Sequence, residues 1–63
     1  MDQKILNMAE MIGCNKKQFF DIICKSSGNI TMSSGSWYSP FYLFDDTGLL
    51  AKYDSKGGLL FNR

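Results

Sequence analysis

Residues 8–23, Met-Ala-Glu-Met-Ile-Gly-Cys-Asn-Lys-Lys-Gln-Phe-Phe-Asp-Ile-Ile, hold two short amphipathic segments separated by a glycine, and this stretch decides the fold. At 100° per residue, the apolar side chains of the first segment fall on one stripe, which consists of Ile5, Met8, Ala9 and Ile12. Asp2 suits the N-cap position, and Gly13 suits the left-handed conformation that ends a helix. The sequence therefore predicts a first helix between Asp2 and Gly13.

A second helix is predicted to begin after Asn15, which suits an N-cap, and to run over residues 16–25. Its apolar stripe consists of Phe19, Ile22 and Ile23, and Ser26-Ser27-Gly28 ends it. Ala9 precedes Gly13 by four residues, and a small residue there lets two helices cross closely while the glycine makes the turn. These offsets predict a helix-turn-helix unit over residues 1–27.

Residues 28–63 have the pattern of an antiparallel meander. The predicted strands are residues 41–44, 49–53 and 59–62, separated by turns that begin with Asp and end in Gly. Residues 30–32 suit a further short strand, so the predicted meander has three or four strands. The fold class is therefore α+β: one domain over residues 1–63, with a helix-turn-helix followed by a small sheet, similar to a winged helix.

The two turns form a small repeat of the type aromatic-Asp-x-x-Gly-x-Leu, in residues 44–50 and 53–59. A carbohydrate-associated repeat or a calcium site are the functional alternatives. Two copies are too few for a repeat architecture, and calcium needs more closely spaced oxygen ligands around one loop. The pattern favours turn formation alone.

Composition argues against an enzyme. The chain has no histidine, so it lacks the commonest general base, and its two cysteines, Cys14 and Cys24, are too few for a structural zinc site. We interpret both cysteines as small apolar residues and predict no catalytic residue, metal or cofactor. No segment is long and apolar enough to span a membrane, and the N-terminus lacks the pattern of a signal peptide, which predicts a cytoplasmic protein without a membrane partner.

The N-terminal part of the second helix is the candidate DNA-binding surface. Lysines suit phosphates and guanine, and side-chain amides suit adenine. The predicted nucleic-acid-binding residues are Asn15, Lys16, Lys17, Gln18 and Lys25. The alternative is an ordinary solvated helix face, because the net charge is only +1.

A second set of residues points to a protein partner or a homodimer. Leu6, Met11 and Phe20 lie beside the apolar stripes of their helices, so either the sheet covers them or they form an exposed patch. Trp37 and Tyr38 join this candidate partner-binding set. The aromatic residues 37, 38, 41, 42 and 44 also suit base stacking, but no basic residue lies between Lys25 and Lys52, which favours packing in the core and the sheet.

Several short motifs resemble the C-terminal domain of phage antirepressors, the KilAC type. The resemblance covers most of residues 5–53 and rests on four stretches: residues 8–13, a second helix centred on Phe19, residues 28–30 before a Ser/Trp loop, and residues 40–42 before Gly48-Leu49. Family members usually carry an additional N-terminal domain and a longer C-terminal part. The resemblance implies a phage or prophage regulator in the host cytoplasm that binds DNA or a repressor protein, and binding to DNA is the main prediction. The alternative is an inhibitor or antirepressor that binds a host or phage protein, and no small-molecule substrate is evident.

Overall fold

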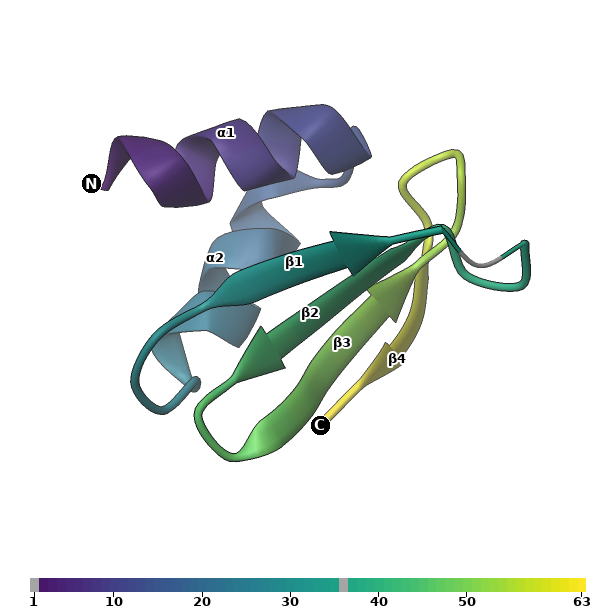
Figure 1. The fold of residues 1–63 in the computed structure, drawn as a ribbon. Coiled ribbons are helices and arrows are strands. Elements are labelled where there is room, and N and C mark those ends of the chain that lie inside the picture. The colour runs from purple at the N-terminus through teal and green to yellow at the C-terminus, as the bar shows by residue number, and fades with distance from the viewer. Residues whose placement is uncertain (1, 36) are drawn as a thin grey trace.

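The computed structural model describes residues 2–35 and 37–63, and it has the predicted order of two helices followed by an antiparallel sheet. Figure 1 shows helices α1 (Gln3–Ile12) and α2 (Lys16–Cys24) and strands β1 (Thr31–Ser34), β2 (Phe41–Asp45), β3 (Gly48–Tyr53) and β4 (Leu59–Asn62). The predicted α+β fold class is confirmed. Met1, the first residue of the predicted helix-turn-helix, lies outside the described residues.

Both helices begin and end on the predicted capping residues, with one small difference. The Asp2 carboxylate accepts the Lys4 N–H at 3.0 Å, and the Asn15 side chain accepts the Gln18 N–H at 2.9 Å. Gly13 adopts the left-handed conformation with φ 76° and donates its N–H to Ala9. Helix α2 ends at Cys24 rather than Lys25, because Lys25 is already the C-cap.

The sheet is a meander in the order β1-β2-β3-β4, and every neighbouring pair is antiparallel. Strands β2, β3 and β4 lie within one residue of their predicted bounds. The first strand is shifted, since residues 31–34 pair with β2 while Ile30 is buried in the core before the strand begins. Bulges interrupt the register between Leu43 and Phe44 and between Lys52 and Tyr53.

One face of the sheet packs against the helices. The buried apolar residues come from both layers and are Ile5, Met8, Ala9, Ile12, Phe19, Ile22, Ile30, Leu43, Leu50, Ala51 and Tyr53. The predicted stripes are therefore confirmed, except that Ile23 is only partly buried at the edge of this core. Burial of this apolar surface is the main favourable term in folding.

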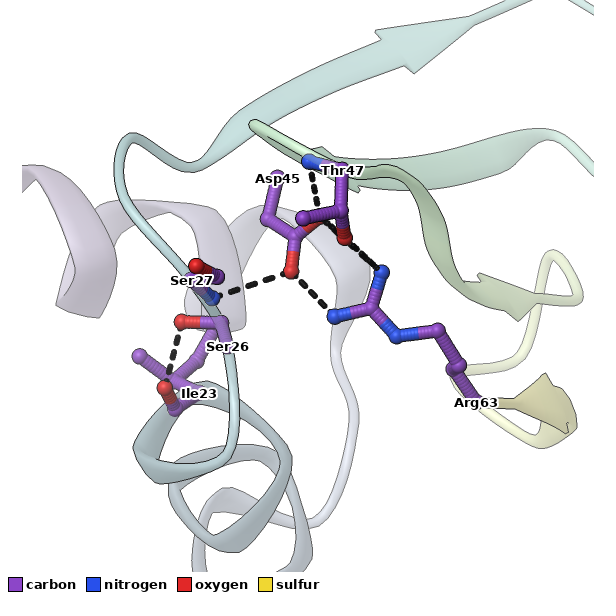
Figure 2. A network of polar contacts seen from close by, with 6 residues as sticks. All are labelled: Ile23, Ser26, Ser27, Asp45, Thr47 and Arg63. Carbon is purple, nitrogen blue, oxygen red and sulfur yellow. Dashed lines mark hydrogen bonds and ion pairs between the residues drawn. The ribbon is translucent and has the colours of Figure 1, made fainter.

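A buried carboxylate joins three separate segments of the chain at one end of the sheet. The Asp45 side chain has no exposed surface and accepts the Ser27 N–H at 3.0 Å and the Thr47 N–H at 2.9 Å. Arg63 donates N–H groups from both terminal guanidinium nitrogens to this carboxylate and also donates to the Thr47 hydroxyl (Figure 2). These donors, with Arg63 and Thr47 foremost, hold the pKa of Asp45 well below its usual range. This Asp45 network fixes the loop after α2, the β2–β3 turn and the C-terminal end of the described chain.

The described residues contain neither a membrane-spanning helix nor a cluster of metal ligands. No helix in residues 2–35 and 37–63 is long and apolar enough to cross a membrane. Within the same residues, no three side chains of His, Cys, Asp or Glu gather as metal ligands.

Candidate nucleic-acid interface

Three of the five predicted nucleic-acid-binding residues lie together at the N-terminus of α2, and all five are exposed. The side-chain oxygen of Asn15 caps the helix by accepting the Gln18 N–H. The Lys16 ammonium lies 3.5 Å from Glu10, but both side chains are more than half exposed. Such a surface pair contributes little stability, so Lys16 can exchange Glu10 for another anion at small cost. Lys17 completes this cationic helix end, where the helix dipole also favours anions.

Gln18 and Lys25 point to a different part of the surface. They line a cavity of about 250 Å³ between α2 and the sheet. Its other lining residues are Asp21, Ile22, Leu50, Leu59, Asn62 and Arg63. Asp21 and Lys25 both line this cavity, and the charge of Arg63 is paired with Asp45. The lining therefore carries charges of both signs. The predicted set is therefore split between the N-terminal end of α2 and this cavity.

The turn between β3 and β4, residues 54–58, packs directly on the turn of the helix-turn-helix, and sequence reasoning did not find this contact. Gly57 has φ 82°, and a Cβ built there would lie 2.6 Å from the Gly13 carbonyl carbon and 2.9 Å from the Cys14 nitrogen. Only glycine allows the two backbones to approach so closely. Figure 1 shows the β3–β4 turn beside the connection between α1 and α2.

This contact brings a third lysine to the same end of the molecule. Lys56 is exposed in the β3–β4 turn, one residue before Gly57. The turn also contains Asp54, whose carboxylate accepts the N–H groups of Lys56 at 2.9 Å and Gly58 at 2.7 Å. Asp54 is thus engaged by its own turn. We call residues 15–17 and Lys56 the helix–turn surface.

The predicted partner-binding residues come from three segments and differ in exposure. Met11 is 65% exposed on α1, whereas Leu6 is half-buried. Phe20 packs against the core and meets Phe19 edge-to-face at 6.0 Å. Phe20 is therefore covered by the protein and does not belong to an exposed patch. Trp37 and Tyr38 are exposed in the loop after β1 and stack on each other at 3.9 Å. The expectation of core or sheet packing is wrong for these two, because they precede β2 and belong to no strand.

The two cysteines differ in environment, although the sequence interpretation treated them alike. Cys14 is half-buried near Tyr53, and burial raises the pKa of its thiol, so this thiol is protonated at neutral pH. Tyr53 is fully buried, and burial raises its pKa to about 12. Cys24 is exposed on α2, so it is not a core residue, and both cysteines are free.

Comparisons with known proteins give no relative for this chain. No protein-family model matches the sequence, and no curated protein and no solved structure is significantly similar to it. The resemblance to KilAC-type domains therefore rests on the short motifs quoted above and stays a prediction.

Proposed function

We propose that this protein is a small regulator, of the kind the phage antirepressor resemblance implies, that binds duplex DNA through the helix–turn surface. In this proposal α2 enters the major groove with its N-terminal residues, as recognition helices do. The β3–β4 turn acts as the wing and brings Lys56 to the adjacent phosphates. The observation that carries the proposal is the contact of Gly57 with Gly13, which holds the wing against the helix-turn-helix turn.

Charge distribution supports this surface more than net charge does. The chain has seven Lys and Arg against six Asp and Glu. Several of the carboxylates are engaged by other groups of the protein: Asp45 by Arg63, Asp54 by its own turn, and Asp2 by the α1 N-terminus. Lys17 and Lys56 are exposed, and neither forms an ion pair within the part of the chain that the structure describes. A local cationic surface on a nearly neutral protein predicts modest affinity with a small salt dependence.

The test is fluorescence anisotropy with pooled genomic duplex fragments over a range of salt concentrations. We expect the double variant Lys17→Glu, Lys56→Glu to abolish binding, and each single Lys→Gln variant to reduce the slope of log affinity against log salt by about one. Lys4→Glu is the matched control, because Lys4 is an exposed lysine on α1 outside this surface. Equal losses for Lys4→Glu and Lys17→Glu, or no binding by the wild-type protein at low salt, would contradict the proposal.

The second candidate is an inhibitor or antirepressor that binds a protein, and one observation favours it. Trp37 is 83% exposed and stacks on Tyr38, and large exposed aromatic residues are typical anchors of protein interfaces. Affinity capture from a host lysate with wild type and Trp37→Ala separates the candidates. Capture of one defined protein that Trp37→Ala abolishes, together with absent duplex binding, favours this second function.

A further inference from the structure

The face of the sheet opposite the helices carries a row of side chains that the sequence does not bring together. Strand register places Tyr42 beside Ser33 on one side and Lys52 on the other, and Lys52 beside Phe61. Directly paired residues point to the same face, so these four side chains form one row across all four strands. A second row contains Thr31, Phe44 and Leu49. We call these two rows the open sheet face.

None of these residues belongs to the core, and the core residues of β2 and β3 lie between or next to them along the strands. Tyr42, Phe44, Leu49 and Lys52 are half-buried, and Phe61 is 42% exposed. Figure 1 shows α2 behind the sheet, so this helix covers only one of its two faces. The open sheet face therefore presents aromatic side chains from two strands, β2 and β4, to solvent.

The aromatic rings on this face have the arrangement of a stacking surface. The rings of Tyr42 and Phe44 lie 6.5 Å apart with an interplanar angle of 22°, so they present nearly parallel surfaces. Phe61 lies two strands from Tyr42, about 10 Å at the usual strand spacing. Lys52 pairs with both residues across the strands and so lies between them, and its ammonium is 5.7 Å from the centre of the Phe61 ring. Lys52 is thus a cation at the middle of the row, with an aromatic ring on each side.

The charge on the open sheet face has a single sign. Lys52 is the charged residue among the two rows, and no Asp or Glu occurs in either of them. Aromatic rings with an interposed cation are the combination with which proteins bind single-stranded nucleic acid, because bases stack on the rings and the phosphate pairs with the cation. We propose that the open sheet face binds single-stranded nucleic acid, with bases on Tyr42 and Phe61 and the intervening phosphate on Lys52.

Two other occupants fit the same face less well. Duplex DNA keeps its base faces stacked inside the helix, so it offers the exposed rings no stacking partner. A second copy that docks face-to-face about a two-fold axis through the middle of the row brings two Lys52 ammonium groups together. Like charges at a contact are unfavourable, so this arrangement opposes a symmetric dimer. The proposal is independent of duplex binding by the helix–turn surface, which lies at the turns rather than on the strands.

The test uses the full chain and a fluorescein-labelled 12-nucleotide oligothymidylate, with anisotropy measured at low and physiological salt. We expect Phe61→Leu and Tyr42→Leu each to weaken binding at least about fivefold, since each variant keeps an apolar side chain but removes one stacked base. Lys52→Gln should weaken binding and lower the salt slope by about 0.7. Circular dichroism melting of each variant establishes that it is folded at the assay temperature.

Trp37→Ala is the matched aromatic control, because Trp37 is more exposed than Phe61 but lies in the loop rather than on the open sheet face. It should bind the oligonucleotide as wild type does. A loss for Trp37→Ala as large as that for Phe61→Leu overturns the proposal, as does the absence of wild-type binding at low salt. Sedimentation equilibrium gives a further way to contradict the proposal. If the wild-type protein is a dimer and Phe61→Leu is a monomer, the open sheet face binds a second copy of the chain instead.

Discussion

The two hairpin turns of the sheet share a sequence pattern but differ in what they hold. In both, an aspartate follows an aromatic residue and accepts the N–H two positions later, at 2.9 Å for Asp45 with Thr47 and for Asp54 with Lys56. Asp45 is buried and also binds Ser27 and Arg63 from distant segments, whereas Asp54 bonds only within its own turn among the described contacts. In the second turn the distant contact is made instead by Gly57, against Gly13.

This difference shows that the repeat encodes the local turn and not its tertiary role. The prediction that both copies are turns is confirmed, because both connect antiparallel strands. Which residue of each turn matters for stability depends on what lies beside it. In the β2–β3 turn that residue is a carboxylate, and in the β3–β4 turn it is a glycine without a side chain.

The largest effect is expected for Gly57→Ala. A Cβ there overlaps the backbone of Gly13 and Cys14, and the left-handed φ adds strain. We expect a loss of about 2–4 kcal/mol in the free energy of unfolding by urea. Gly13→Ala is the matched control, because Gly13 has a similar φ but nothing within 4 Å of the added Cβ, and it should cost about 1 kcal/mol. Equal losses would show that the turn does not rest on the helix-turn-helix.

A smaller loss is expected for Asp45→Asn. The two Asp45 oxygens accept different N–H groups, one from Ser27 and the other from Thr47, so the amide keeps only one of these bonds. It also removes the charge that pairs with Arg63. The melting temperature should fall more than it does for Asp54→Asn, in which only local bonds of the turn are involved. A larger decrease for Asp54→Asn contradicts the assigned difference between the turns.

Acid should remove the stability that the charged Asp45 carboxylate contributes to the wild-type protein. The Asp45 pKa is lower in the folded state than in the unfolded chain, where it is about 3.9. Its contribution to stability is therefore complete above about pH 4 and decreases as the pH falls below that value. Melting temperatures measured from pH 7 to pH 2 should show the difference between wild type and Asp45→Asn shrinking in acid. If the difference in melting temperature does not change with pH, the charge of Asp45 is not its cause.

The smallest effect is expected for Asp54→Ala. This variant loses two hydrogen bonds from backbone N–H groups that are near solvent and can bond to water instead. A loss of about 1 kcal/mol in the free energy of unfolding is expected, and DNA binding should change little. If Asp54→Ala weakens duplex binding as strongly as Lys56→Gln does, then the turn's shape matters more than its charge.

The sequence was sufficient for the features that depend on local chemistry. Asp2, Gly13 and Asn15 determine the helix ends, and the apolar stripes determine the buried faces, so these were predicted correctly. Contacts between distant segments were not predicted, because no local pattern pairs Gly57 with Gly13 or Arg63 with Asp45. The absence of basic residues between Lys25 and Lys52 argued against stacking, yet antiparallel pairing places Lys52 beside Tyr42. Separation along the chain does not measure distance across the sheet, where Lys52 and Tyr42 are neighbours, and base stacking stays a prediction.

The meander order of the sheet has a kinetic consequence. Each strand pairs with its neighbour along the chain, so the hairpins can form through short loop closures, which are fast. The contact of Gly57 with Gly13 joins residues far apart in the chain, so its closure costs more chain entropy than the closure of either hairpin. We expect the wing turn to dock last in folding and to open first, so its amides should exchange with solvent deuterium sooner than those of β2 and β3.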